Sequence, residues 1–150
     1  MGNRRKAREL AMQALFSMDM SQNGSKDILE RFCDNFKPSS KALSFFLKLV
    51  QGVLHTRTEI DAVIERYSKN WKLNRMSCVD RNIMRVAVYE LLCCQDIPHK
   101  VSINEAIDIG KKFGTEESGA FINGILDSIR LALENKDVDV NIVFSPNTVE

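Results

Sequence analysis

The fold is decided by the stretch Ser77-Cys-Val-Asp-Arg-Asn-Ile-Met-Arg-Val-Ala-Val-Tyr-Glu-Leu-Leu-Cys-Cys94, whose apolar side chains point to all sides of a helix. Ser77 and Asp80 have the spacing of a capping box, in which each side chain accepts a hydrogen bond from the other residue's backbone amide. A helix that is apolar all round needs other helices to cover it. We therefore predict a buried central helix that begins at this box.

Apolar residues at spacings of three and four recur on both sides of this stretch, which predicts an all-α fold. Upstream, the pattern covers about residues 4–20, 26–36, 41–56 and 60–71, and a break at 56–58 separates the last two. Downstream, Ser102 and Glu105 form a second capping box, Gly114 is a natural helix stop, and Thr115 can cap a last helix. We expect about seven helices.

These helices are expected to form two packed subdomains within one domain over residues 1–135. An N-terminal helical bundle is predicted over about residues 1–71, and a three-helix bundle over about 77–135. Residues 136–150 lack the helical pattern and are expected to form a loosely held tail.

The composition is typical of a folded globular chain, since 44% of the 150 residues are hydrophobic, 27% are charged, and the net charge is +1. No apolar run is long enough for a membrane span. The basic N-terminus leads into a mixed sequence and not into the apolar region of a signal peptide. We therefore expect a cytoplasmic protein with no membrane contact.

The four cysteines, Cys33, Cys78, Cys93 and Cys94, lack the spacing of a zinc site and are interpreted as reduced thiols. A metal site built from Cys93, Cys94 and His99 is the alternative. Glycine-rich loops that cradle phosphates are missing from the sequence, so we expect no metal and no nucleotide cofactor.

The N-terminus carries a cluster of four cations, Arg4, Arg5, Lys6 and Arg8, and Glu9 is the only acidic residue among the first eighteen. On a helix these cations converge and repel one another, and an acidic partner would relieve the repulsion. Arginine suits phosphate through its bidentate fork, and a short arginine-rich segment suits single-stranded or irregular RNA. A solvated basic end is the alternative.

Selectivity for RNA needs stacking or base-edge groups near this cluster, and the candidates are Phe16, Lys111, Lys112, Phe113 and Phe121. Phe121 lies at the edge of an apolar stripe that already contains Ile122, so it is either a partly exposed stacking residue or a core-edge aromatic. Glu90 lies on the apolar central helix, and we expect it to accept backbone amides at a neighbouring helix start. No carboxylate, histidine or nucleophile completes a catalytic set, so we predict no enzyme activity.

Three separated blocks of the sequence together resemble the NusB family. The blocks are Arg4-Arg-Lys-Ala-Arg-Glu-Leu-Ala-Met-Gln-Ala-Leu-Phe16, then Val79-Asp-Arg-Asn-Ile-Met-Arg-Val-Ala-Val-Tyr-Glu-Leu91, and a third from Ile97 to Asp127. The resemblance implies two helical subdomains, no catalysis, and a role in transcription antitermination. It implies binding to boxA RNA of nascent ribosomal RNA transcripts as a heterodimer with the ribosomal protein NusE, which joins RNA polymerase with NusA and NusG.

The resemblance also implies which residues meet the partners. Arg4, Arg5, Lys6 and Arg8 match the arginine-rich RNA-binding motif, and Glu117, Ser118 and Phe121 match the place where the last helix meets RNA. The ribosomal-protein partner would face Asp80, while Phe16 and Met18 lie near the RNA and partner faces, although Met18 stands where tryptophan is common.

Two other interpretations of the sequence remain. A related domain occurs at the N-terminus of some ribosomal RNA cytosine methyltransferases and shares some of these blocks. A protein-interaction adaptor, possibly a homodimer, would leave the basic end merely solvated and would bind no RNA.

Overall fold

The computed structural model describes residues 2–21, 25–69 and 71–137. In these residues it contains seven α-helices, one short 3-10 helix and no strand, which confirms the predicted all-α fold. The elements are α1 Asn3–Ser21, α2 Ser25–Phe36, α3 Ser40–His55, α4 Arg57–Arg66, η1 Leu73–Arg75, α5 Cys78–Cys93, α6 His99–Phe113 and α7 Ser118–Glu134. None of the described helices is long and apolar enough to cross a membrane.

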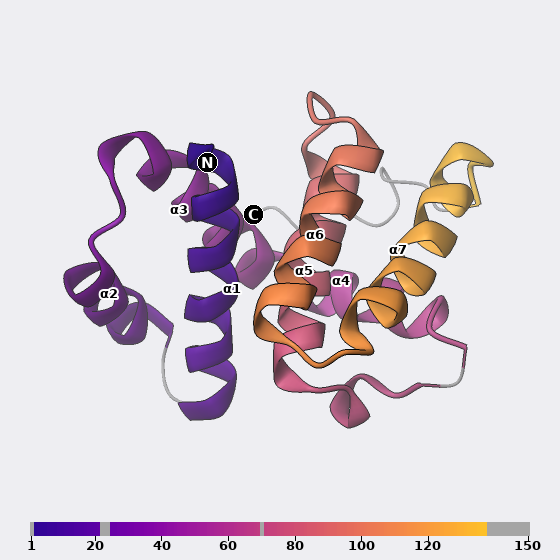
Figure 1. Ribbon diagram of the computed structural model, residues 1–150, viewed down its shortest axis with the longest axis horizontal. Helices are drawn as coiled ribbons and strands as arrows, with labels where there is room; N and C mark the ends of the chain where they lie inside the picture. The colour runs from indigo at the N-terminus through magenta and orange to yellow at the C-terminus, as the bar shows by residue number, and fades with distance from the viewer. Residues whose placement is uncertain (1, 22–24, 70, 138–150) are drawn as a thin grey trace.

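The central helix is α5, which contacts α1, α3, α4, α6 and α7 (Figure 1). Its buried positions surround the helix, as the apolar pattern predicts. Figure 1 shows α1, α2 and α3 gathered on one side and α5, α6 and α7 on the other, with α1 between α3 and α5. The boundary at residue 71 stays a prediction, since α4 packs against α5 and α7 as well as α3.

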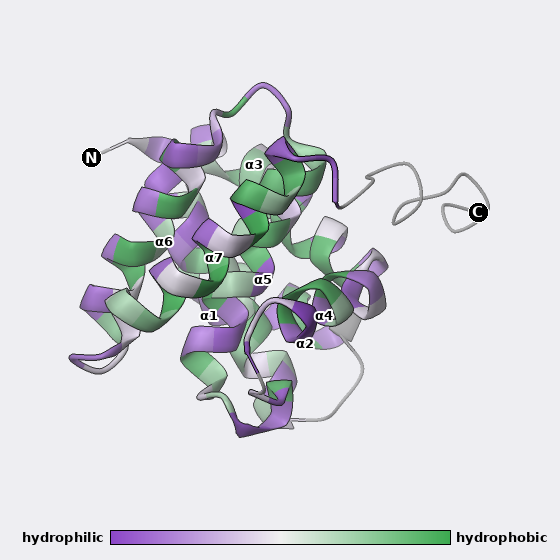
Figure 2. Cartoon of the chain, turned by 90° about the vertical axis from the view of Figure 1, so that its right-hand side faces the viewer, coloured by the Kyte–Doolittle hydropathy of each residue, from purple (hydrophilic) through white to green (hydrophobic). Residues whose placement is uncertain are grey.

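The core is built from the apolar faces of all these helices, and Figure 2 shows the green and purple bands of amphipathic helices. Its fully buried large side chains include Phe46, Leu49, Ile60, Ile64, Met84, Leu92, Ile122, Leu126 and Ile129. Each such side chain contributes roughly 1.5–3 kcal/mol through burial. Helix α1 adds the small residues Ala7, Ala11 and Ala14, which allow close packing.

The predicted helix over 60–71 is wrong at its C-terminal end, because α4 stops at Arg66. The buried Ser68 hydroxyl donates to the backbone oxygens of Glu65 and Trp71, at 3.0 and 2.6 Å. The backbone amide of Leu73 donates to the Glu65 carboxylate at 2.7 Å. These bonds hold a compact turn in place of further helix.

Half of the first capping box is present. The Ser77 hydroxyl accepts a hydrogen bond from the Asp80 amide at 3.0 Å, but the Asp80 carboxylate is not recorded as accepting one from Ser77. The second box is wrong, because Pro98 precedes an earlier helix start and α6 begins at His99. Ser102 therefore lies inside the helix, where its side chain is free to contact another element.

Candidate nucleic-acid interface

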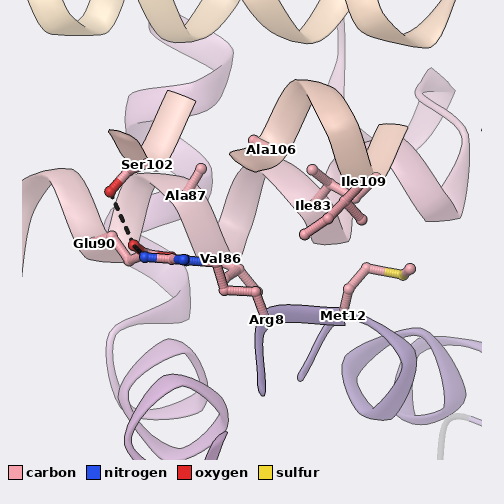
Figure 3. Close-up of a pocket in the computed structure, with 9 residues that line it drawn as sticks. All are labelled: Arg8, Met12, Ile83, Val86, Ala87, Glu90, Ser102, Ala106 and Ile109. Carbon is pink, nitrogen blue, oxygen red and sulfur yellow. Dashed lines mark hydrogen bonds and ion pairs between the residues drawn. The ribbon is translucent and has the colours of Figure 1, made fainter. Parts of the chain in front are cut away.

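Arg8 lies in the interior, where its side chain is 5% exposed and pairs with Glu90 of α5 (Figure 3). Its Nε and Nη2 donate to the two Glu90 carboxylate oxygens at 2.8 and 2.9 Å, and its Nη1 donates to Glu105 at 3.2 Å. The Ser102 hydroxyl also donates to Glu90, at 2.9 Å. Glu90 therefore accepts side-chain donors, and the prediction that it accepts backbone amides is wrong.

This network removes Arg8 from the surface that the other N-terminal cations form. A bidentate guanidinium–carboxylate pair fixes both groups in orientation as well as distance. Arg8 and Glu90 border a small cavity of about 10 Å³ between α1, α5 and α6 (Figure 3). Arg8 therefore holds α1 against α5 and α6 through its hydrogen bonds to Glu90 and Glu105.

Arg5 lies about one helical turn before Arg8 and is half-buried against α6. It donates hydrogen bonds to the carboxylates of Glu105 and Asp108, the latter at 2.9 Å. The hydrogen bond from Arg5 lowers the pKa of Glu105, and the nearby charge of Arg5 and Arg8 adds to this effect. The same contacts with Glu105 raise the pKa of Arg5.

Arg4 and Lys6 are the exposed members of the N-terminal cluster. The Arg4 Nη2 atom lies 3.6 Å from an Asp96 carboxylate oxygen, and its guanidinium lies 4.8 Å from the centroid of the Phe45 ring. Lys6 has no ion pair recorded with any described residue. The repulsion within the cluster is relieved in part inside the chain, because carboxylates of α5, α6 and their connection pair with three of its cations.

Lys111 and Lys112 are exposed on the last turn of α6. Lys112 Nζ donates to the Glu9 carboxylate at 3.0 Å, which joins the end of α6 to α1. Cations also interact favourably with the partial negative charge at a helix C-terminus. Helix α6 therefore ends in two exposed basic side chains shortly before the start of α7.

The start of α7 divides the three predicted RNA residues between surface and interior. Glu117 is exposed and Phe121 is partly exposed. Ser118 is buried, and its hydroxyl accepts a hydrogen bond from the Thr115 amide at 2.9 Å. The structure thus brings Glu117 and Phe121 to the surface and uses Ser118 to shape the turn before α7.

Trp71 is a surface residue that the sequence reasoning missed. Its side chain is half exposed, and its ring meets Phe121 edge to face, with centroids 5.6 Å apart. Its place in a turn and not in a helix is what brings it to Phe121. The signal in the sequence was a single tryptophan between two lysines, Lys69 and Lys72.

Asp80 and Phe121 line the same hollow of about 200 Å³, together with Trp71, Met76, Ser77, Thr115 and Glu117. Asp80 is only 8% exposed, yet one of its carboxylate oxygens, Oδ1, has no hydrogen-bond partner among the described residues. A buried polar atom without a partner destabilises a fold unless something satisfies it. The residue predicted to face a protein partner and the residue predicted to face RNA are therefore neighbours.

Phe16 and Met18 lie in different environments. Phe16 lines an apolar hollow of about 270 Å³ with Met12, Phe32, Phe36, Val79 and Phe113, among others. Met18 is 6% exposed and belongs to the core. The prediction that Met18 lies at a binding face is therefore not met by its position, whereas Phe16 is available to a partner.

A second charged cluster, which the sequence did not reveal, surrounds Asp19 at the end of α1. The Asp19 carboxylate accepts hydrogen bonds from Arg57, Arg81, Arg85 and the Asn82 amide, at 2.7 to 3.1 Å. Burial alone would raise the pKa of Asp19, but the Asn82 hydrogen bond and the charges of Arg85 and Arg57 lower it to about 2. This cluster ties α1 to α4 and α5.

The described residues contain no group of three or more side chains that could hold a metal ion. All four cysteines are free thiols. Burial raises the pKa of Cys93 to about 11, which keeps the thiol protonated at neutral pH.

Comparison with known proteins identifies the family and its fold. The model of the NusB family matches residues 5–130. The transcription antitermination protein NusB of Desulfatibacillum aliphaticivorans is 57% identical over 137 residues, covering 91% of this chain and 96% of that protein. The structure of T. maritima NusB has a TM-score of 0.80 at 40% identity and covers 90% of this chain and 97% of its own. A crystal structure of antitermination factors NusB and NusE in complex with dsRNA has a TM-score of 0.80 at 27% identity, covering 88% and 98%.

Proposed function

This chain belongs to the NusB family, and from that premise we propose that it binds boxA-type RNA as a heterodimer with the ribosomal protein NusE. The heterodimer joins RNA polymerase with NusA and NusG to promote antitermination. The relatives are antitermination proteins, and one structural neighbour is a complex of NusB with NusE and RNA, which supports both partners. The proposed function is non-enzymatic. We also propose that the protein acts in the cytoplasm, because it binds nascent transcripts.

The observation that carries the RNA proposal is the set of cations on α1 and α6 that lie at the surface. Arg4, Arg5 and Lys6 lie at the start of α1, Lys111 and Lys112 lie at the end of α6, and the ion pair of Lys112 with Glu9 joins that end to α1. In the proposal they form one basic surface that ends at the partly exposed Phe121 of α7. Cations along such a surface neutralise phosphates, and an aromatic ring at its end offers a base a stacking surface. Glu117 lies beside Phe121, where it suits base N–H groups better than phosphate.

Arg8 and Ser118 serve this surface indirectly in the proposal. Arg8 holds α1 against α5 and α6 through Glu90, and so fixes Arg4 and Arg5 over α6. Ser118 fixes the turn that presents Glu117 and Phe121.

The NusE face is proposed at Phe16 and Asp80. Phe16 offers an apolar hollow, and Asp80 offers a carboxylate oxygen that still needs a donor. Met18 supports this face from the core beneath it. A homodimer that covers the Phe16 hollow when NusE is absent is the alternative occupant, and sedimentation with and without NusE separates the two.

The RNA proposal is tested by measuring the affinity for boxA-like and scrambled RNA across a salt series, with and without NusE. Arg4, Arg5 and Lys6 are changed together to glutamine, and the matched control changes the exposed Arg31, Lys37 and Lys41. Loss of three phosphate contacts should reduce the log–log salt slope by about 2, at roughly 0.7 per contact on a single strand. If the first variant keeps the wild-type affinity and slope, the RNA surface is wrongly placed.

A further inference from the structure

Trp71, which lies between α4 and α5, is an exposed aromatic residue whose backbone makes two hydrogen bonds with Ser68. Trp71 is 50% exposed, but its backbone oxygen accepts the buried Ser68 hydroxyl and its amide donates to the Ser68 carbonyl. The following turn is held by Glu65, which accepts the Leu73 amide. The half-exposed Trp71 ring, in edge-to-face contact with Phe121, leaves an aromatic face open for stacking.

The space beside this aromatic pair is open. Trp71 and Phe121 border a hollow of about 270 Å³ that also includes Ser68, Lys69, Ala120 and Gly124. A β-carbon at Gly124 would meet nothing within 4 Å, so no packing requires a glycine there. Glycine inside a helix destabilises it by roughly 0.5–1 kcal/mol relative to alanine. The absence of a side chain at Gly124 leaves the hollow open.

The hollows near the Trp71–Phe121 pair differ in charge. The hollow that contains Asp80 and Glu117 is acidic, which disfavours phosphate. Lys69 borders the hollow beside Gly124, Lys72 follows Trp71 in the chain, and Arg75 lies in η1. None of these three cations has an ion pair with a described residue. Lys72 and Arg75 border a further hollow in which Arg57, Arg81 and Arg85 make five cationic side chains against the three carboxylates of Asp19, Asp61 and Glu65.

We propose that Trp71 and Phe121 form a stacking platform for an unpaired RNA base, seated in the hollow beside Gly124, while neighbouring phosphates lie against Lys69, Lys72 and Arg75. The inference rests on the proposed RNA-binding function and extends it beyond Phe121 into the segment between α4 and α5. RNA is favoured over a peptide because the hollow continues the proposed RNA surface through Phe121. Aromatic faces interleaved with unpaired cations are also the side chains that single strands use.

Trp71 is the only tryptophan of the chain, so its fluorescence reports on this platform alone. Titration of the full-length protein with short boxA-like single-stranded RNA should quench this fluorescence along the same curve that an independent affinity measurement gives. Binding without any change in Trp71 fluorescence would overturn the proposal.

Two substitutions test the platform by affinity. Trp71→Ala should weaken binding of the same RNA roughly 5- to 150-fold, the range found for loss of one base stack, and Trp71→Phe should recover most of it. Gly124→Met fills the hollow from a position with free space, so it should weaken binding without lowering the melting temperature. The matched control is Leu131→Ala, which removes an exposed apolar side chain from the same helix.

The outcomes separate this inference from the proposed function. If the wild type binds RNA and the Arg4, Arg5 and Lys6 variant loses affinity while Trp71→Ala and Gly124→Met bind as tightly as the wild type, the platform is refuted and the function stands. If the wild type binds no RNA with or without NusE, both are refuted. If Trp71→Ala loses NusE binding but keeps RNA binding, the surface belongs to a protein partner and the inference is wrong.

Discussion

The buried pair between Arg8 and Glu90 leads to a prediction about stability and about the role of Arg8. Each charge is almost fully enclosed, and removing one partner of such a pair leaves the other without compensation, at about 3–5 kcal/mol. The two single substitutions should differ, because their remaining contacts differ. In Glu90→Gln, Arg8 keeps Glu105 at 3.2 Å, so the loss should be near 3 kcal/mol.

In Arg8→Met, Glu90 keeps only the Ser102 hydroxyl, so the loss should be near 5 kcal/mol. For a chain of this size, 1 kcal/mol corresponds to roughly 2–4 °C, so the melting temperature should fall by roughly 6–12 °C in Glu90→Gln and further in Arg8→Met. The double variant contains no buried charge at this site and should recover much of the loss. Denaturant unfolding followed by circular dichroism gives all four free energies of the cycle.

The double variant also distinguishes positioning from contact. If Arg8 acts only by holding α1 in place, RNA affinity should follow stability: it should fall in both single variants and recover in the double variant to the extent that stability does. The reasoning is refuted if Arg8→Met costs less than about 1 kcal/mol, as an exposed pair would, or if the two single losses simply add in the double variant. If Glu90→Gln, which keeps Arg8, binds RNA as tightly as the wild type while an equally stable double variant binds weakly, Arg8 is assigned to direct contact.

Other predictions concern Asp19, two of the helical glycines and Asp80. The pKa of Asp19 in the folded state is about 2, below its ordinary value of 3.8. Ionised Asp19 therefore stabilises the fold above about pH 4, and this stabilisation is lost as the pH falls towards 2. In Asp19→Asn, the free energy of unfolding measured across this range should lose that part of its pH dependence. In thermal melts, Gly52→Ala should destabilise the fold by about 1–3 kcal/mol, because the new β-carbon would overlap the Tyr89 ring. Gly124→Ala should stabilise the fold by about 0.5–1 kcal/mol, because a β-carbon there meets no other atom. Equal effects of the two substitutions would contradict the packing at both sites. Asp80→Ala should weaken NusE capture and leave the affinity for RNA alone unchanged, and the reverse result would place Asp80 on the RNA side.

Local sequence signals predicted most of the helical fold, because helix periodicity and caps depend on residues a few positions apart. The central helix from Ser77, the break near Thr56 and the stop at Gly114 are all of this kind. The end of α4 was missed because it depends on Ser68 and Glu65, whose hydrogen bonds form only once the chain turns.

The candidate site was harder to predict, since its charges pair across the chain. Arg8 is 82 residues from Glu90, and Arg5 is 100 residues from Glu105, so the N-terminal cluster looks unpaired in the sequence. Burial of Ser118 and Met18 likewise depends on which helix covers them. Residue type identified the basic surface, while only the packing shows which of its members can reach a ligand.

The contact of Arg5 with Glu105 and Asp108 has a consequence for selectivity. The carboxylates of Glu105 and Asp108 on α6 already accept the hydrogen bonds that the Arg5 guanidinium would otherwise donate to a phosphate. A polyanion that approaches Arg5 exchanges with these carboxylates and does not simply add to a vacant cation. We therefore expect that a polyanion binds at Arg5 with a net gain in free energy only if it makes further contacts elsewhere on the proposed surface.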